Sequence, residues 1–181
     1  MKEAYSEEYE LVRKALKGDK FSFGVLVRQY QSQVAKTVMG MLGHTQEAED
    51  VGQEVFIRFY RSMNQYNGDS SLGTYLTRIA INLSLNAIKK QKNRKTADIS
   101  KIEYQLSAED TIGKTDTKEL VEKALQQLDS EFRSVVVLRL IEGYSTKETA
   151  NLLKLPLGTV LSRLSRAQIK LKELLKKEIT H

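Results

Sequence analysis

Apolar residues recur every third or fourth position through most of the 181-residue chain, the spacing that places them on one face of an α-helix. Glycines and an Asn67-Gly68 turn separate these periodic segments. The pattern predicts helices over residues 7–17, 20–42, 46–64 and 70–94. Residues 134–141, SVVVLRLI, also suit a strand, but Ser130 can begin a helix there and Gly143 can end it. We therefore expect an all-α fold.

The periodic pattern stops between residues 96 and 117, where apolar residues become sparse and Ser, Thr and Asp collect. This segment has a net charge of −3, whereas residues 1–95 carry +5 and residues 118–181 carry +4. A stretch of this length without periodicity is longer than most loops inside a compact domain. The sequence thus predicts two small helical domains, residues 1–95 and 118–181, joined by an acidic flexible linker, residues 96–117.

The only proline of the chain, Pro156, lies between two segments of helical periodicity near the C-terminus. The first segment follows Ser145-Thr-Lys-Glu148, which has the pattern of a capping box that begins a helix. Proline disfavours helical geometry at the preceding Leu155 but fits the first turn of a new helix. Two helices joined by almost no connection are predicted here, which is a helix-turn-helix.

The helix after Pro156 has two unlike faces. Counting about 100° per residue from Leu157 predicts a core-facing side made of Leu157, Val160, Leu164, Gln168, Leu171 and Leu175. The opposite side carries Thr159, Ser162, Arg163, Arg166 and Lys170. Arginine can bind guanine edges or phosphates and small hydroxyls allow close approach, so this side fits a DNA major groove. A solvated basic surface is the alternative.

Residues 47–61, EAEDVGQEVFIRFYR, predict a helix whose exposed stripe is acidic at one end and basic at the other. The stripe consists of Glu47, Asp50, Glu54, Arg58 and Arg61. Such a stripe can be simply solvated, with ion pairs one turn apart, or it can be a docking face for a protein partner.

Residues 70–97 contain no acidic side chain. One stripe of the helix predicted there carries Tyr75, Arg78, Asn82, Asn86 and Lys89. Aromatic rings stack on unpaired bases, amides bind base edges and cations neutralise phosphates, so this stripe suits single-stranded DNA. The alternative is a half-buried core tyrosine with ordinary surface asparagines beside it.

Composition narrows the classes of function. A net charge of +6 suits a partner that is nucleic acid, and the lack of cysteine excludes disulfides and thiolate zinc sites. There is no glycine-rich phosphate loop, no Cys/His metal set and no nucleophile–base pair, and both histidines are isolated. We therefore expect that the protein is not an enzyme and binds no cofactor or metal ion. We also expect a cytoplasmic protein, because neither a signal peptide nor an apolar run of membrane-spanning length occurs in the sequence.

Three segments in order, AEDVGQEVFIRFYRS, YNGDSSLGTYLTRIAINLSLNAIKK and LPLGTVLSRLSRA, resemble a bacterial sigma factor of the extracytoplasmic-function (ECF) group, in the sigma-70 family. The resemblance covers about residues 7–95 and 118–178. It implies a region-two domain, a region-four domain and a role in promoter-specific transcription initiation. The implied partners are the clamp helices and flap of the RNA polymerase core, promoter DNA and an anti-sigma factor. The linker would thread the polymerase near the RNA exit path.

The resemblance also implies roles for particular residues. The docking motif for the clamp helices is matched by Asp50, Gln53 and Glu54. The part that captures a flipped base of the minus-ten element is matched by Gly68, Asp69, Ser70 and Ser71 and by the following helix, with Tyr75, Arg78, Asn82, Asn86 and Lys89. The positions that contact the minus-thirty-five element are matched by Ser162, Arg163 and Arg166, and Thr159 and Lys170 share their face.

The sequence departs from the family pattern at five positions. Gly52 is found where the family usually has an apolar residue, Tyr75 where tryptophan is common and Asn86 where aspartate is frequent. Lys154 is found where the family often has a turn glycine. Leu161 is found where the family often has a lysine or arginine, which puts the usual minus-thirty-five sequence in doubt.

Two other classes of protein compete with a sigma factor: a helix-turn-helix regulator that binds a palindrome as a dimer without polymerase, and a helical adaptor that binds only proteins.

Overall fold

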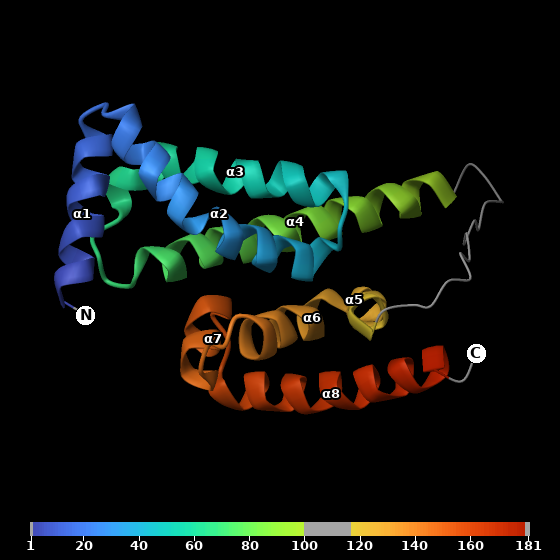
Figure 1. Cartoon of the computed structure of the whole chain (residues 1–181). Coiled ribbons are helices and arrows are strands. Elements are labelled where there is room, and N and C mark those ends of the chain that lie inside the picture. The colour runs from blue at the N-terminus through green and yellow to red at the C-terminus, as the bar shows by residue number, and fades with distance from the viewer. Residues whose placement is uncertain (1, 100–116, 180–181) are drawn as a thin grey trace.

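The computed structural model describes residues 2–99 and 117–179, and in these ranges the chain is helical with no strand. Four α-helices precede residue 100: α1 (Lys2–Leu16), α2 (Lys20–Leu42), α3 (Gln46–Ser62) and α4 (Leu72–Ile99), with a short 3-10 helix, Met63–Gln65, after α3. Four α-helices follow residue 116: α5 (Thr117–Gln127), α6 (Ser130–Val136), α7 (Thr146–Leu153) and α8 (Leu157–Ile179). The predicted all-α class is confirmed. Figure 1 shows α1–α4 as one group and α5–α8 as a second group packed beside it.

The helix boundaries follow from local chemistry that the sequence carries. Thr45 begins α3 by accepting a hydrogen bond from the Ala48 amide at 3.1 Å, and Gly43 ends α2 with a φ of 73° that few other residues adopt. The β-branched run 134–141 is helical, as expected. It continues α6 through a π-helical segment, Val137–Ile141.

The predicted linker agrees only partly with these bounds. α4 continues to Ile99, so residues 96–99 are helical, and α5 already begins at Thr117. The remainder of the predicted linker, residues 100–116, lies outside the described residues.

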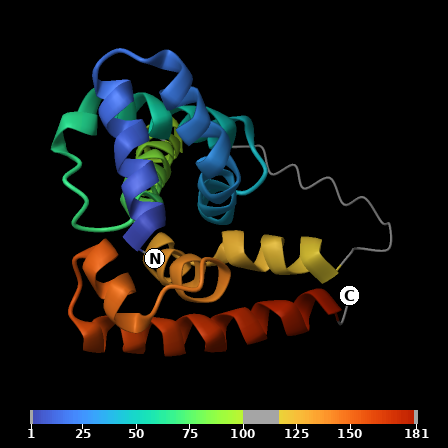
Figure 2. The ribbon, with the colours of Figure 1, turned by 60° about the vertical axis from the view of Figure 1, so that its left-hand side comes forward.

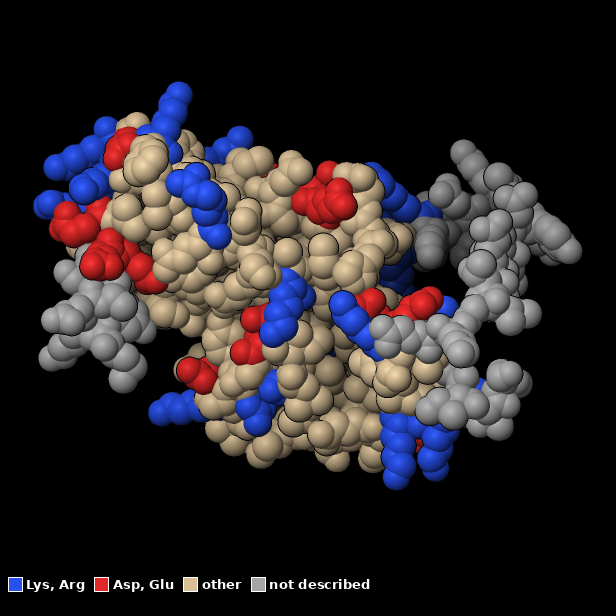
Figure 3. Space-filling model, in the orientation of Figure 1, with Lys and Arg blue, Asp and Glu red and all other residues tan. Residues whose placement is uncertain are grey.

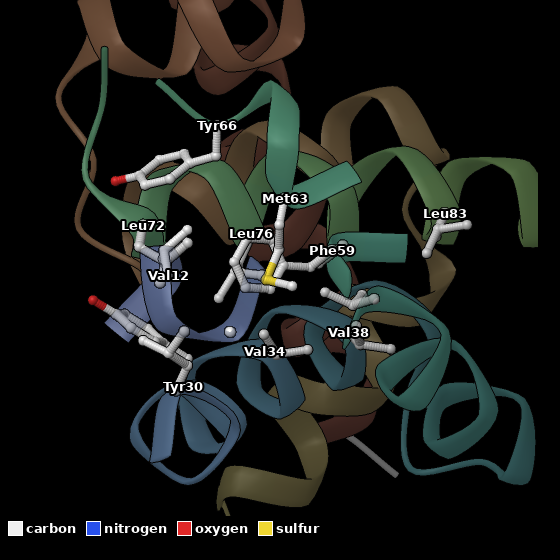
Figure 4. Packing of buried hydrophobic residues seen from close by; sticks show 14 of the residues in the cluster. Val12, Tyr30, Val34, Val38, Phe59, Met63, Tyr66, Leu72, Leu76 and Leu83 are labelled. Carbon is white, nitrogen blue, oxygen red and sulfur yellow. The ribbon is translucent and has the colours of Figure 1, made fainter. Parts of the chain in front are cut away.

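The first hydrophobic core lies among α1–α4 (Figure 4). Its largest fully buried side chains include Val12, Leu26, Val34, Val55, Phe59, Leu72 and Leu76. These residues come from all four helices at helical spacing, which is why the pattern of the sequence predicts the elements well.

The second core joins the two groups of helices. Met41 of α2 and Ile81 of α4 are buried in one cluster with Leu125, Leu128, Val136, Val137, Leu138, Leu152 and Ala167. The approach is close at Gly40, where a β-carbon would lie 3.0 Å from Val137 Cγ2. A side chain at residue 40 would therefore force α2 away from the π-helical segment.

A buried arginine fastens this joint. Arg133 of α6 is only 8% exposed. Its Nη1 donates to the Met41 carbonyl and to Gln126 Oε1, both at 2.6 Å, and its Nη2 donates to the Leu128 carbonyl at 2.9 Å and to the Gln126 carbonyl. Burial lowers the pKa of Arg133, but charge-assisted hydrogen bonds to carbonyls compensate for its lost hydration.

Polar contacts continue along the same joint. Lys36 Nζ of α2 donates to the Ile141 carbonyl at 2.7 Å. Tyr144 Oη, between α6 and α7, donates to Thr77 Oγ1 of α4 at 3.1 Å, and Gln33 Nε2 donates to the same oxygen at 3.1 Å.

Among the described helices, none combines the length and the apolar composition that a membrane span requires.

Candidate nucleic-acid interface

The helix-turn-helix forms as its sequence pattern predicts. The Glu148 amide donates to Ser145 Oγ at 3.2 Å and the Ser145 amide donates to Glu148 Oε2 at 2.8 Å, which makes a complete capping box at α7. These bonds lower the pKa of Glu148. Lys154 ends α7 in the left-handed region, with a φ of 54°, at the position where a glycine is frequent. Pro156 then opens α8, its carbonyl accepting from the Thr159 amide at 3.0 Å.

The buried face of α8 differs from the predicted one. Val160 and Ala167 are fully buried, whereas Leu157 and Gln168, predicted to face the core, are exposed. At about 100° per residue, the buried face is turned by roughly 70° from the expected direction. The cause is packing against α6, because the small Ala167 lets α8 approach the second core closely.

This rotation changes which predicted DNA-facing side chains reach solvent. Ser162, Arg166 and Lys170 are exposed, but Thr159 and Arg163 are half-buried. Arg163 Nη2 lies 2.7 Å from Glu131 Oε2, so this guanidinium is turned toward α6. Ser162 Oγ donates to the Thr159 carbonyl at 3.1 Å within the helix.

Lys170 is also paired within the molecule. Its Nζ lies 2.8 Å from Asp129 Oδ2, and 5.1 Å from the ring centre of Phe132. The hydrogen bond and the charge of Lys170 lower the pKa of Asp129. Two acidic side chains next to the start of α6 therefore hold two of the five predicted cationic or hydroxyl side chains of α8.

The predicted stripe on α4 divides into an exposed and a partly buried portion. Asn82, Asn86 and Lys89 are exposed, and Arg78 is partly buried. Tyr75 is partly buried: its ring packs against Phe59 and Tyr66 with centroids 6.1 and 5.3 Å away. The half-buried position that was the alternative for Tyr75 is thus what the fold produces.

The predicted loop 68–71 is shaped by its neighbours. Gly68 has a φ of 79° and Asp69 is exposed. Ser71 Oγ accepts from the Thr74 amide at 3.2 Å and so begins α4, while Tyr66 Oη donates to the Ser70 carbonyl at 3.0 Å. Sequence reasoning did not single out Tyr66, although an aromatic residue directly before an Asn-Gly turn was a usable signal.

The acidic stripe of α3 stays at the surface. Asp50 and Gln53 are exposed, and Glu54 Oε1 lies 3.2 Å from Arg58 Nε. Beside it, a groove of about 270 Å³ runs between α2 and α3. Its lining includes Val27, Met39, Gly52, Gln53 and Phe56, most of which the sequence did not mark as functional. The usable signal was Gly52, which is found where the family pattern has an apolar residue. In the structure a β-carbon at Gly52 would meet nothing within 4 Å.

These sites lie on different parts of the molecule. Figures 1 and 2 place α8 at the outer edge of the second group of helices, with α5 and α6 between it and the first group, which contains α3 and α4. The fold thus brings none of the three predicted sites together. Among the described residues, no group of three or more His, Cys, Asp and Glu side chains could hold a metal ion.

Comparison with known proteins assigns each group of helices. The family described as Sigma-70 region 2 matches residues 26–94, and Sigma-70, region 4 matches residues 118–171. RNA polymerase sigma-H factor of Pseudomonas aeruginosa is 32% identical over 174 residues, covering 90% of both chains. ECF RNA polymerase sigma-E factor of Escherichia coli is 32% identical over 170 residues, covering 87% of this chain and 88% of the relative.

Two solved structures share the fold. The sigma factor RpoE of Bartonella quintana, in complex with the anti-sigma factor NepR, has a TM-score of 0.69 at 22% identity and covers 85% of this chain and 96% of its own. CnrH, in complex with the cytosolic domain of CnrY, has a TM-score of 0.66 at 23% identity and covers 94% of this chain and 98% of its own.

Proposed function

This chain belongs to the ECF group of the sigma-70 family, and on that premise we propose how its residues direct RNA polymerase core to a promoter. A sigma factor supplies start-site selection and is not an enzyme. The rival class, a dimeric helix-turn-helix regulator, would account for residues 118–171 but not for the region-two match at residues 26–94. We propose that residues 1–95 dock on the core and hold the minus-ten element, while residues 118–181 hold the minus-thirty-five element.

The proposal is carried by the second helix of the helix-turn-helix. α8 turns Ser162 and Arg166 to solvent at the molecular edge, where a duplex can approach without a clash from the first group of helices. Arg166 is the first exposed cation along α8 and makes no ion pair within the described part of the chain. It is the side chain we assign to a guanine edge or a phosphate.

The minus-ten element is assigned to α4 and the loop before it. Asn82, Asn86 and Lys89 are exposed on an acid-free stretch, and Asp69 is exposed in the preceding loop. Tyr75 is held by Phe59 and Tyr66, which would keep its accessible surface rigid for a base. Unstacking a base step costs a few kcal/mol, and stacking on an aromatic returns about 1–3 kcal/mol, so capture of bases can drive melting without ATP.

Core docking is assigned to the exposed end of α3, at Asp50, Gln53 and Glu54, with the adjoining groove available to apolar side chains of the clamp helices. The family assignment also leads us to propose an anti-sigma factor as a regulator and the cytoplasm as the place of action. Among the solved structures of similar fold, RpoE is in complex with the anti-sigma factor NepR, and CnrH is in complex with the cytosolic domain of CnrY.

Binding both elements of one promoter requires the two groups of helices to separate. The minus-ten and minus-thirty-five elements lie about 25 base pairs apart, or about 85 Å of duplex. α4 has 28 residues and is the longest described helix, so it spans only about 42 Å. The joint at Gly40 and Arg133 therefore belongs to the unbound protein in this proposal.

The decisive experiment is run-off transcription with purified core polymerase on a promoter library, with and without this protein. Start-site-specific transcripts that depend on the protein are the expected result. Glu54→Lys should reduce core binding, whereas Glu119→Lys, which breaks an equivalent ion pair to Lys123 at 3.1 Å on α5, should not. If the polymerase gains no start-site selectivity, the proposal is wrong. If both variants bind core alike, only the docking assignment is wrong.

A further inference from the structure

The outward surface of α8 is uncharged over its first turns. Leu157 is 48% exposed and Leu161 is 50% exposed, although leucine usually gains free energy from burial. Between Leu157 and Ser165 the only cation is Arg163, which is half-buried against Glu131. Figure 3 shows uncharged side chains along the middle of the lower edge of the molecule, with Lys and Arg groups near both ends of α8.

This surface points away from the core. Among residues 157–166, those within about 70° of the direction opposite to Val160 and Ala167 are Gly158, Leu161, Ser162, Ser165 and Arg166. Leu157 lies about 110° from that direction, at the border of this surface. A β-carbon at Gly158 would meet nothing within 4 Å, so the backbone there is open to close approach. The first turns of the second helix are the part of a helix-turn-helix that contacts base edges in the major groove.

The chemistry of these side chains restricts what they can recognise. Leucine has no hydrogen-bonding group, and the Ser162 hydroxyl already donates to the Thr159 carbonyl. Neither can donate to the N7 and O6 acceptors of guanine as an arginine would. The complementary group in the major groove is the C5-methyl of thymine, which packs against apolar side chains.

We infer that Leu161, with Leu157 one turn before it, contacts thymine methyl groups and gives this sigma factor a preference for T·A pairs in the part of its minus-thirty-five element that α8 covers. The inference rests on the proposed function of α8. Arg166, more than one turn further along α8, then binds a guanine edge or a phosphate next to the thymines. Leu161 occupies the position of a cation that would favour guanine.

The test removes one methyl group at a time. The preferred minus-thirty-five element is first selected from a randomised library with purified core and the wild-type protein. Each thymidine in it is then replaced by deoxyuridine, which lacks only the C5-methyl, and open-complex formation is measured. At one or two positions we expect open-complex formation to fall about fourfold, which corresponds to the transfer free energy of one buried methyl group.

The variants assign that loss to a side chain. In Leu161→Ala the effect of deoxyuridine at one of these positions should disappear, and Leu157→Ala should remove the effect at a neighbouring position. Ile169→Ala is the matched control, because Ile169 is an apolar residue 57% exposed on the same helix, but about 12 Å further from the first turns. It should leave every methyl effect unchanged. Leu161→Arg should shift the selected base toward guanine.

Two results would overturn the inference while the proposed function stands. One is specific transcription with no methyl effect at any thymine, which would leave the leucines to a protein partner. The other is a full methyl effect in both Leu161→Ala and Leu157→Ala. Absence of any start-site-specific transcript would instead contradict the proposed function. Because both leucines are exposed, the variants should unfold at the same urea midpoint as the wild type, which excludes misfolding as the cause.

Discussion

The two groups of helices bury their hydrophobic side chains in different ways. The first core consists only of residues from α1–α4 and from the segment that joins α3 to α4, where Met63 and Tyr66 are buried. The second group has a small cluster of its own, at Val135, Ala150 and Val160, but its larger cluster is completed by Met41 and Ile81 from the first group. The first group thus closes its own core, while the second takes part of its burial from the first. The joint between them should therefore control the stability of the second group more than that of the first.

The polar side chains predicted to bind DNA also differ between the two groups of helices, because ion pairs within the molecule hold two of those on α8. On α8, Arg163 and Lys170 are paired with Glu131 and Asp129. On α4, Asn82, Asn86 and Lys89 are exposed and have no partner among the described residues. DNA would have to displace carboxylates from part of α8, but nothing comparable from this part of α4.

The largest effect is expected from removing the buried cation of the joint. Arg133→Met keeps most of the volume but leaves the carbonyls of Met41 and Leu128 without their donor. Hydrogen bonds to charged groups contribute about 1.5–3 kcal/mol, so we expect a loss of about 3 kcal/mol in the free energy of unfolding. Urea denaturation followed by circular dichroism measures it. Arg166→Met, at an exposed position, is the control and should stay within about 0.5 kcal/mol.

A side chain at Gly40 should separate the two groups directly. Gly40→Leu places a β-carbon 3.0 Å from Val137 Cγ2. Overpacking costs about 1–3 kcal/mol, and the higher helix propensity of leucine offsets up to about 1 kcal/mol. Small-angle X-ray scattering should show a larger radius of gyration. Gly52→Ala is the matched control: its β-carbon meets nothing, so stability should rise by up to about 1 kcal/mol with no change in size.

A smaller effect is expected at the cap of α7, and it depends on pH. Ser145→Ala removes the hydroxyl that accepts from the Glu148 amide, at a cost of about 1 kcal/mol at neutral pH. The pKa of Glu148 is lowered in the folded state from its usual 4.5, so its contribution is complete above that value and is lost as the pH falls through the folded pKa.

The difference in unfolding free energy between wild type and Ser145→Ala should therefore shrink in acid. Burial raises the pKa of Glu142, which acts in the opposite direction, but both proteins share it and it cancels in the difference. A difference that grows as the pH falls below 4.5 would contradict the role of Glu148 in the cap.

The smallest effect concerns the paired cations of α8. Glu131→Gln should release Arg163 and strengthen binding to minus-thirty-five duplex by at most about fivefold, because exposed ion pairs contribute only about 0.2–1 kcal/mol. Fluorescence anisotropy of holoenzyme on labelled duplex measures this change. Glu119→Gln, on α5, is the control for the loss of one negative charge. Equal changes in the two variants would mean that net charge, and not the release of Arg163, is responsible.

The sequence predicted most of the fold because helix formation depends on nearby residues. The capping box at Ser145 and Glu148, the cap at Thr45 and the break at Pro156 each involve groups within a few positions of one another. The periodic apolar residues of α1–α4 likewise share a core within one group of helices. The sequence also predicted polar side chains that are exposed on α3 and α4, among them Asp50, Gln53, Asn82, Asn86 and Lys89. These side chains make few contacts with residues far away in the chain, so helical spacing alone places them at the surface.

Only the tertiary structure decided which face of α8 is buried, which of its cations are paired and how the two groups of helices meet. Ala167 enters the second core and Leu157 stays outside because α6 approaches α8 at one angle and not another. Arg133 is buried because carbonyls of α2 and of the α5–α6 connection converge on it. These outcomes depend on contacts between residues far apart in the chain, and the periodicity of a single helix carries no information about the direction from which its neighbours come.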